Sequence, residues 1–368
     1  MKKIMIVFGT RPEAIKMCPL VRELISRESY DLRVCLTGQH RDLVGSVMRA
    51  FEVRADHELS VMLRDQSLAS LTSRALSAVD RVLRIELPDL LLVHGDTSTA
   101  HAAALAAFYL GIPIAHVEAG LRTSQIGSLF PEEFDRRVID MISTLCFCPT
   151  EQSRDRLIAE GKDPRSIFVT GNTAIDAIRY TIRPDFRHPI LELGKNDRLV
   201  LATLHRRESI GEPMRGMLRA IRRVAEEHES VCVVLPTHPN PAVRRIVSEE
   251  LRGVERITLT EPLEVLDFHN ILSRSSIVLT DSGGIQEEAC ALGVPTLVLR
   301  DETERGEGIE AGGLLLVGRE EEGIYNAFSR LLDDRELWQR MASASCPFGM
   351  GDASQKITDA IETYFARG

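Results

Sequence analysis

Short apolar runs alternate with segments of helical periodicity along most of the chain. Strands that alternate with helices form right-handed βαβ units, and such units build a parallel sheet that is covered on both faces. The first half therefore predicts one doubly wound sheet. Its strands are the runs KIMIVF, DLRVCLT, DLLLVHG, IPIAHVE, TLCFCPT and IFVTG, and its helices begin near Pro12, Arg41, Ser67, Ser98, Glu132 and Glu151.

The polar stretch from Arg183 to Arg198 interrupts this alternation, as a linker would, and a second series follows it. The second strands are RLVLATLH, VCVVLP, RITLT, SIVLTD, PTLVLR and LLLVG, with helices that begin near Glu212, Pro241, Leu263, Ile285 and Glu320. We predict an α/β fold with two Rossmann-like, doubly wound parallel-sheet domains that face each other across a cleft. The domains are residues 1–182, on which the terminal helix 352–368 packs back, and residues 183–351.

Composition narrows the class of protein. A chain of 368 residues with 44% hydrophobic content suits two globular domains, and none of its apolar runs is long enough to span a bilayer. A net charge of −9 argues against nucleic acid and anionic membranes as partners. Seven cysteines without a framework spacing indicate reduced thiols and a cytoplasmic location. Neither a metal-ligand cluster nor a dinucleotide fingerprint is present, so we expect no metal and no cofactor.

Two strand-to-helix turns are typical of phosphate binding. In IVLTDSGGIQEE, Ser282, Gly283 and Gly284 lie between a strand and a helix, where backbone N–H groups and the positive helix end converge. In FGTRPEAIK, Arg11 and Lys16 add positive charge at the start of the first helix. The alternative for this second turn is a capped helix with surface basic residues.

Carboxylates follow two neighbouring strands of the first domain. Asp96 ends the strand DLLLVHG and Glu118 ends IPIAHVE, so both belong to one sheet edge and should approach each other. Closely spaced carboxylates raise one another's pKa, as acid/base catalysis requires. Taken singly, each could be a helix cap or a salt-bridge partner. Glu132, in FPEEFDRR, is also an ordinary first-turn residue.

Basic and aromatic groups follow strands of the second domain. His205 and Arg206, in HRRES, suit a diphosphate clamp or a solvated basic turn paired with Glu208. His238 follows the next strand and is either a turn residue or a ligand contact. Arg305, in RDETER, belongs either to a binding loop or to a salt-bridged surface loop.

Together these motifs resemble the non-hydrolysing UDP-N-acetylglucosamine 2-epimerases, which have a glycosyltransferase-B-like two-domain fold. The resemblance runs from the first strand to the terminal helix. It implies that UDP-GlcNAc and UDP-ManNAc are interconverted by elimination of UDP to 2-acetamidoglucal and re-addition, with no cofactor. It also implies a UDP-binding second domain and a homodimer that serves polysaccharide biosynthesis. The motifs that carry it are FGTRPEAIKM, LTGQHR, VHGDTSTA, HVEAGLRT, FPEEFDRR, VTGNTAIDA, HRRES, EPLEVLDFHN, LTDSGGIQEEA and RDETER.

The resemblance assigns roles residue by residue. Asp96, Glu118 and Glu132 carry the acid/base roles, and which of them removes the C2 proton stays open. His205 is expected to act in catalysis and to hold the diphosphate. The other expected diphosphate contacts are Arg11, Lys16, Arg136, Ser282 and Gly283, joined by Gly284 of the same turn. Glu288 corresponds to the ribose contact, Phe268 to the uracil side, and Arg305 to a sugar or phosphate contact.

Many bacterial relatives bind a second UDP-GlcNAc as an activator beside the active site. Gln39, Glu132, Arg206 and His238 match that site. Two positions depart from it, because Asp42 replaces a common glutamine and Asp65 stands where those relatives carry arginine. Losing a cation and gaining acids beside a diphosphate weakens binding. We therefore predict weak or absent activation by substrate, so strongly sigmoidal kinetics in UDP-GlcNAc would contradict this prediction.

Other activities remain open at this point. Asp135 replaces a usual asparagine and Gly306 a usual proline, which leaves the exact sugar uncertain. One alternative is the related epimerase of UDP-2,3-diacetamido-glucuronate, and another is a hydrolysing 2-epimerase that releases ManNAc. A glycosyltransferase of the same fold and a non-catalytic nucleotide-sugar sensor are further alternatives. The product mixture and deuterium at C2 distinguish them.

Overall fold

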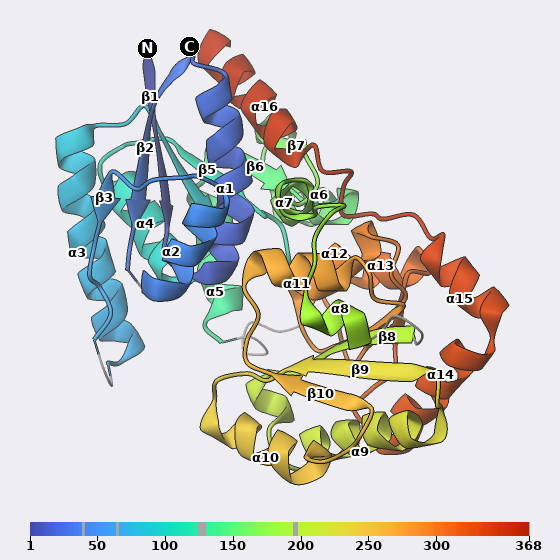
Figure 1. Ribbon diagram of the computed structural model, residues 1–368. Coiled ribbons are helices and arrows are strands. Elements are labelled where there is room, and N and C mark those ends of the chain that lie inside the picture. Colours follow the sequence, from blue (N-terminus) through green and yellow to red (C-terminus); the bar gives the residue numbers. More distant parts are fainter. Residues whose placement is uncertain (39–40, 64–65, 124–129, 194–197, 368) are drawn as a thin grey trace. The chain divides into compact units, whose positions relative to one another are not determined.

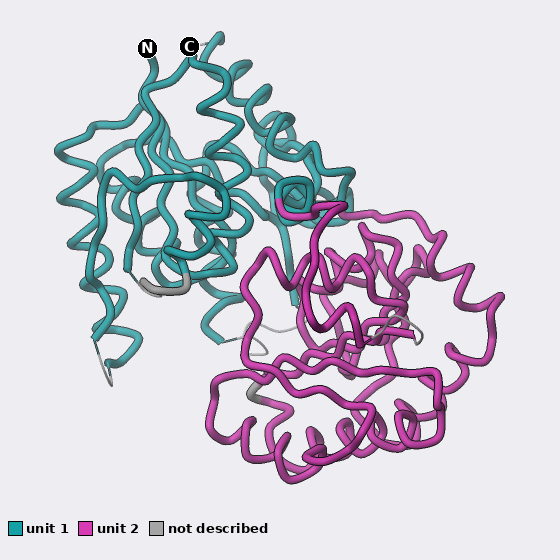
Figure 2. The backbone as a smooth tube through the Cα atoms, in the orientation of Figure 1, with its two compact units in different colours: residues 1–180, 349–368 teal, residues 181–348 magenta. Residues whose placement is uncertain are grey.

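The computed structural model describes residues 1–38, 41–63, 66–123, 130–193 and 198–367. The chain forms two compact units, which Figure 2 colours separately. Unit 1 consists of residues 1–180 and 349–368, and unit 2 consists of residues 181–348. The chain therefore crosses between the units twice, and its last segment belongs to the first unit.

Unit 1 is built on a parallel sheet of seven strands in the described part of the chain, in the order β3-β2-β1-β4-β5-β6-β7. Register runs in parallel between every pair of neighbours, for example Ile4 with Leu90 and His94 with Val117. The central strands are buried on both faces, as a sheet covered by helices requires. The strands are β1 (Lys2–Phe8), β2 (Tyr30–Leu36), β3 (His57–Glu58), β4 (Leu90–His94), β5 (Ile114–Val117), β6 (Leu145–Cys148) and β7 (Ile167–Val169).

Helices pack on the sheet of unit 1 (Figure 1). One apolar cluster joins Met5 and Val7 of β1 to helices α3, α4 and α5. The terminal helix α16 packs on α1, which also contacts α2. The helices of unit 1 are α1 (Arg11–Ser26), α2 (Arg41–Ala50), α3 (Leu68–Glu86), α4 (Ser98–Tyr109), α5 (Glu132–Ile142), α6 (Glu151–Ala159), α7 (Thr173–Thr181) and α16 (Ala353–Arg367), with the short 3-10 helix η1 (Pro164–Ser166).

Unit 2 repeats this plan with six parallel strands among its described residues, in the order β10-β9-β8-β11-β12-β13. The larger cluster packs α9, α10 and α14 against Val200 and Ala202, and the smaller one packs α11 and α12 against Leu199 and Leu201. The strands are β8 (Arg198–Thr203), β9 (Val231–Pro236), β10 (Ile257–Thr260), β11 (Ile277–Thr280), β12 (Thr296–Val298) and β13 (Leu314–Leu316). The helices are α8 (Pro189–Leu193), η2 (Arg207–Ser209), α9 (Glu212–Glu227), α10 (Pro241–Leu251), α11 (Val265–Leu272), α12 (Gly283–Ala291), α13 (Gly306–Glu310), α14 (Glu321–Asp333) and α15 (Arg335–Ala342).

The predicted α/β class with two parallel sheets is confirmed, and so is each predicted strand and helix. Several short elements were not predicted: β3, α7, α8, α13 and α15. The polar stretch that we interpreted as a linker holds α8, whose Ile190 is buried in the smaller cluster of unit 2. Brief elements of this kind carry too few residues for periodicity to reveal them. Among the described helices, none has both the length and the apolar character that crossing a bilayer requires.

Candidate active site

The N-terminus of α1, the first helix of unit 1, is capped by side chains from the same segment. Thr10 is the N-cap of α1, and the Glu13 side chain completes a capping box. Oε2 of Glu13 accepts hydrogen bonds from the N–H groups of Gly9, at 3.0 Å, and Thr10, at 2.7 Å. These N–H groups are therefore not free for an anion, which corrects our interpretation of this turn as a match for the Ser282 turn. The cations at this helix start are the half-buried Arg11 and the buried Lys16, and both have partners within the protein.

Lys16 reaches the carboxylate at the end of β5. Its ammonium group pairs with Oε2 of Glu118, and each side chain is only about a tenth exposed. Nδ2 of Asn172 donates to the same oxygen at 2.7 Å. Two donors from distant parts of the sequence thus converge on Glu118 and stabilise its ionised form. The sequence did not reveal Asn172, which follows the last strand of the sheet.

Glu118 also has an unusual backbone. Its φ is 69°, in the left-handed region that residues other than glycine seldom adopt. A Cβ atom added to Gly95, at the end of β4, would lie 3.8 Å from Oε1 of Glu118. The ends of β4 and β5 therefore meet at the Glu118 carboxylate. Gly95, which lies at this point, directly precedes Asp96.

Asp96 is not a helix cap, because the N-cap of α4 is Thr97. Its carboxylate pairs instead with Arg136 of α5. Nε and Nη1 of Arg136 are buried and form no hydrogen bond among the described residues, although Nη1 lies 3.5 Å from the Glu133 carboxylate. Glu132 opens α5 and lies one helical turn before Arg136, on the same face. Asp96 and Glu118 thus each pair with a cation, which the sequence did not predict.

Buried imidazole–carboxylate pairs hold the helices around these groups. His101 of α4 contacts Asp135 of α5 at 2.5 Å, and His116 of β5 contacts Asp140 at 2.7 Å. Burial alone would raise the pKa of Asp140, but His116 and the Arg122 guanidinium outweigh it and lower that pKa. Asp135 therefore has a role in packing α5 against α4, independent of any role in the choice of sugar substrate.

In unit 2, a buried aspartate organises the loop after β8. Asp281 is fully buried, and its carboxylate accepts the N–H groups of His205 and Arg206, each at 3.0 Å. Nδ1 of His205 also lies 3.0 Å from Asp281. Burial alone would raise the pKa of Asp281, but the bonds from His205 and Arg206 lower it. Sequence reasoning missed this role, although Asp281 begins the DSGG motif.

His205 and His238 lie together. Their rings stack with centroids 6.0 Å apart, so β8 and β9 bring both histidines to one place. Burial and the neighbouring His205 lower the pKa of His238, which favours its neutral imidazole.

The Ser282 turn has the geometry that the sequence predicted for it. Ser282 is the N-cap of α12, and no side chain caps this helix end. A Cβ atom added to Gly283 would lie 2.9 Å from the guanidinium of Arg305, so only glycine lets that cation approach so closely. Arg305 is buried and donates to Glu287 at 2.8 Å. The loop that carries Arg305 is therefore salt-bridged, which was one of the two interpretations of the sequence. The guanidinium of Arg305 nevertheless lies against the start of α12, which no side chain caps.

Further along α12, Glu288 is 7% exposed and lies 3.5 Å from Nε2 of His269. His269 also contacts the Thr181 hydroxyl at 2.7 Å. Phe268 is half-buried beside these groups and packs on the smaller cluster of unit 2. Helices α11 and α12 thus bring together the residues expected at the ribose and the base.

The structure does not describe three side chains of the predicted activator site. Gln39 and Asp65 lie outside the described residues, as does the side chain of Asp42. Of the remaining members, Glu132 belongs to unit 1, and Arg206 and His238 belong to unit 2. The expected lack of substrate activation stays a prediction.

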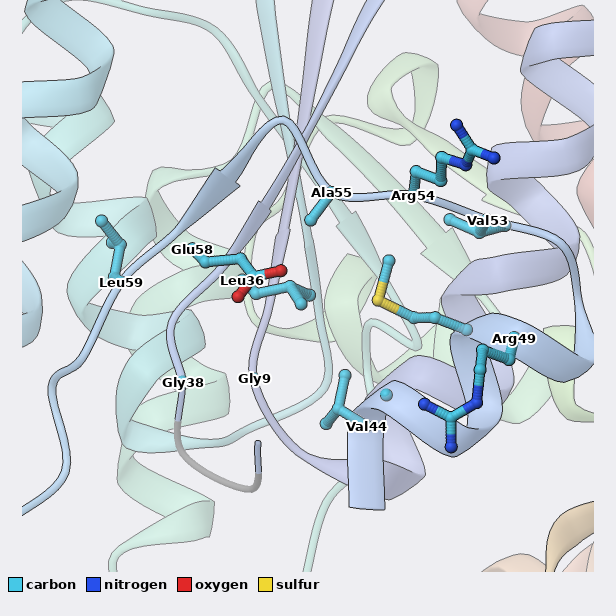
Figure 3. Close-up of a pocket in the computed structure, with 12 residues that line it drawn as sticks. Gly9, Leu36, Gly38, Val44, Arg49, Val53, Arg54, Ala55, Glu58 and Leu59 are labelled. Carbon is cyan, nitrogen blue, oxygen red and sulfur yellow. The ribbon is translucent and has the colours of Figure 1, made fainter. Parts of the chain in front are cut away.

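A pocket of about 610 Å³ opens in unit 1 between α2 and the ends of β2 and β3 (Figure 3). Buried Val44, Met48 and Val53 line it, and the Arg49 and Arg54 side chains lie at its rim. Gly9 borders it, but none of the predicted site residues does. The pocket is therefore separate from the carboxylates, and size alone assigns it no function. In the described residues, no group of histidine, cysteine and acidic side chains is arranged to hold a metal ion.

Comparison with known proteins identifies the family. The family model of UDP-N-acetylglucosamine 2-epimerase matches residues 22–362. The UDP-N-acetylglucosamine 2-epimerase of Bacillus subtilis is 50% identical over 359 residues, which cover 98% of this chain and 94% of that protein. The chain belongs to the UDP-N-acetylglucosamine 2-epimerase family.

Solved structures of the family have the same fold. A putative UDP-N-acetylglucosamine 2-epimerase from Listeria monocytogenes has a TM-score of 0.97 and 49% identity, covering 100% of this chain and 97% of that one. The UDP-GlcNAc 2-epimerase from Neisseria meningitidis, solved with bound UDP-GlcNAc, has a TM-score of 0.93 and 41% identity, covering 98% and 100%. The predicted glycosyltransferase-B-like class of the two parallel-sheet units is thereby confirmed.

Proposed function

We propose that this member of the family is a UDP-N-acetylglucosamine 2-epimerase that interconverts UDP-GlcNAc and UDP-ManNAc. The observation that carries the proposal is the 50% identity with the Bacillus subtilis enzyme along nearly the whole of both chains. The relative from Neisseria meningitidis that binds UDP-GlcNAc supports the same substrate. The residues of the candidate site suit the chemistry.

Inversion at C2 needs an indirect route. No carbonyl group adjoins C2, so its proton is not acidic and simple removal and return is unfavourable. Breaking the bond between the anomeric carbon and the diphosphate oxygen solves this, because UDP leaves with the electron pair as C2 loses its proton. The product is 2-acetamidoglucal. UDP then adds back to C1 while a proton arrives at C2 from the opposite face.

Unit 1 would supply the acid/base groups. We assign these roles to Asp96, Glu118 and Glu132, which lie at the ends of β4 and β5 and at the start of α5. Lys16 pairs with Glu118, which favours an ionised carboxylate in the resting enzyme. Arg136 pairs with Asp96 and with Glu133, and its buried Nε is a donor that a diphosphate oxygen would satisfy.

Unit 2 would hold the nucleotide. The uncapped start of α12 at Ser282, with Arg305 against Gly283, suits the negative charge that develops on the leaving diphosphate. We also assign His205 and Arg206 to the binding of the diphosphate. His238 is assigned to a neighbouring part of the substrate. Glu288 suits the ribose hydroxyls and Phe268 the uracil ring.

We propose that the enzyme is non-hydrolysing, so that both products remain linked to UDP. Purified protein is incubated with UDP-GlcNAc in D2O and followed by proton NMR. The expected result is UDP-ManNAc that carries deuterium at C2, together with deuterium at C2 of the recovered UDP-GlcNAc. The variants Glu118→Gln and Asp96→Asn should lose roughly 100-fold or more of the rate.

Each other product points to a different activity. Free ManNAc with UDP would indicate a hydrolysing epimerase, and unlabelled sugar with no new isomer would refute epimerisation. UDP released only with an acceptor sugar would indicate a glycosyltransferase. Binding of UDP-GlcNAc without any turnover would indicate a non-catalytic nucleotide-sugar sensor.

The family resemblance supports three further proposals. We propose a homodimer, a cytoplasmic location and a place in polysaccharide biosynthesis. Seven free cysteines favour a reducing compartment. Light scattering on the purified protein would measure the oligomeric state directly.

A further inference from the structure

The loop that joins β7 to α7 (Figure 1) brings a neutral side chain to the carboxylate at the end of β5. Asn172 of this loop is buried, with 3% of its surface exposed. Its Nδ2 donates a hydrogen bond of 2.7 Å to Oε2 of Glu118, which lies 54 residues earlier in the chain. Glu118 is one of the residues to which we assigned an acid/base role. The role of this contact in the reaction therefore rests on the proposed function.

The amide of Asn172 has one orientation that satisfies both of its ends. Its Oδ1 accepts the N–H group of Ala174, in the first turn of α7, at 3.0 Å. A turned amide would set its NH2 group against that N–H group and its oxygen against the Glu118 carboxylate. Both contacts would then be repulsive. The backbone of α7 therefore directs Nδ2 toward Glu118 and makes Asn172 a donor.

The backbone of this loop is held by contacts that do not involve Glu118. The carbonyl oxygen of Asn172 accepts the N–H group of Ile175 at 3.0 Å. The chain returns to unit 1 at Gly349 and packs closely on the loop, because a Cβ atom added to Gly349 would lie 3.1 Å from Cα of Gly171. The position of the Asn172 amide is thus set independently of the carboxylate that it contacts.

Other elements also approach Oε2 of Glu118. The Lys16 ammonium of α1 pairs with it, and Nε2 of His94, at the end of β4, lies 3.6 Å from it. Lys16 is also assigned to the diphosphate, whereas Asn172 carries no charge and has no such second role. The last torsion of a glutamate side chain has no sharp preference, so hydrogen bonds determine how its carboxylate is turned. A fixed neutral donor is suited to this task.

We propose that Asn172 is a positioning residue, whose amide holds Oε2 of Glu118 and so orients this carboxylate for proton transfer at C2. The amide exchanges no proton with the sugar. A carboxylate that is turned away from C2 transfers a proton more slowly, although the contacts that bind the nucleotide are kept. Loss of the amide should therefore lower kcat and leave KM nearly unchanged.

Two variants keep the cap of α7 and remove the donor. Serine and aspartate cap helices about as well as asparagine, so both should still accept the Ala174 N–H group. Serine is too short to reach Glu118, and aspartate places a second carboxylate against it. In Asn172→Ser, kcat for formation of UDP-ManNAc should fall by roughly 10- to 100-fold, with KM within about twofold of the wild type. Asn172→Asp should be slower still, because like charges repel.

A double-mutant cycle separates positioning from a general effect on the fold. In the Glu118→Gln enzyme the carboxylate that Asn172 orients is absent. Adding Asn172→Ser to that enzyme should therefore lower the remaining rate by less than about twofold. A loss of the same size in both backgrounds would overturn the proposal, because Asn172 would then act independently of Glu118.

Asp334→Ser is the matched control for the exchange of a helix cap. Asp334 is the N-cap of α15 in unit 2, where it accepts the Leu337 N–H group at 2.8 Å. It is not one of the candidate site residues, so its kcat and KM should both match the wild type. Thermal unfolding of every variant shows whether the fold is kept.

The remaining outcomes distinguish this inference from the proposed function. Wild-type kcat in Asn172→Ser, or a change in KM alone, would overturn the role of Asn172 and leave the epimerase activity standing. Failure of both Asn172 variants to fold would also overturn it, since the side chain would then serve folding. A wild-type enzyme that forms no UDP-ManNAc would overturn the proposed function, and the role of Asn172 with it.

Discussion

Lys16 and Glu118, 102 residues apart in the sequence, form a nearly buried ion pair at the end of β5. Their side chains are 10% and 9% exposed, so neither charge is well solvated. The pair joins the first helix, whose cap is complete without an anion, to the carboxylate that we assign to proton transfer. If Lys16 binds the diphosphate as we propose, the phosphate oxygens would compete with Glu118 for the ammonium group.

Removing Lys16 should leave the nearly buried Glu118 carboxylate without its ammonium partner. We expect Lys16→Met to lower the free energy of unfolding by about 3 kcal/mol. The double variant Lys16→Met/Glu118→Gln should recover most of that loss, because the uncompensated charge is gone. Urea denaturation of the two single variants and the double variant measures this coupling. Losses that simply add would show that the pair does not interact.

Gly283→Ala should weaken UDP binding. The added methyl group would lie 2.9 Å from the guanidinium of Arg305, which two carboxylates hold in place. Displacing that cation from the start of α12 should raise the Kd for UDP by roughly 10-fold, or about 1.4 kcal/mol. Titration calorimetry measures the change. Gly216→Ala in α9 is the control, because its methyl group meets nothing closer than 3.8 Å, and an unchanged Kd for both variants would contradict the argument.

Asp281 should stabilise the fold in a pH-dependent manner. The bonds from His205 and Arg206 lower its pKa against the effect of burial. A carboxyl whose pKa is lower in the folded chain stabilises the fold fully above its unfolded value, about 3.9, and less as the pH falls through the folded value. The stability difference between wild type and Asp281→Asn should therefore be constant between about pH 5 and 7 and shrink below about pH 4. Urea denaturation across this range would refute the assignment if the difference grew in acid.

Cys346 should be the first thiol to react with iodoacetamide. It is half-buried, and a hydrogen bond from the Cys290 thiol and one from the Phe348 N–H lower its pKa against the effect of burial. Burial raises the pKa of Cys18 and Cys35 to about 12. The thiolate is the reactive form, so peptide mass mapping after brief treatment should find the label on Cys346.

Variants at two other cysteines test the cause of this reactivity. Cys290→Ala removes the donor and should slow labelling of Cys346. Cys146→Ala, in the sheet of unit 1, should leave the rate unchanged. Labelling of a fully buried cysteine ahead of Cys346 would be the contrary result.

The sequence alone determined the two parallel sheets and the strand ends that carry the candidate site residues. Parallel strands are buried on both faces, so β1, β4 and β9 appear as continuous apolar runs that need no tertiary information. The carboxyl ends of such strands share one edge, which is why Asp96 and Glu118 were expected near each other. Short elements such as β3, with only two residues, carry no comparable pattern.

Only the tertiary structure decided which partner each charged group has. Glu13 caps the turn that the sequence offered to an anion, Asp281 organises the loop of His205, and His94 approaches Glu118. These contacts join segments whose separation along the chain carries no periodic signal, and their strength depends on burial and on distances of a few ångströms. A motif therefore determines which groups a strand end presents, while the packing of the neighbouring strands and helices determines which of them caps a helix and which pairs with an opposite charge.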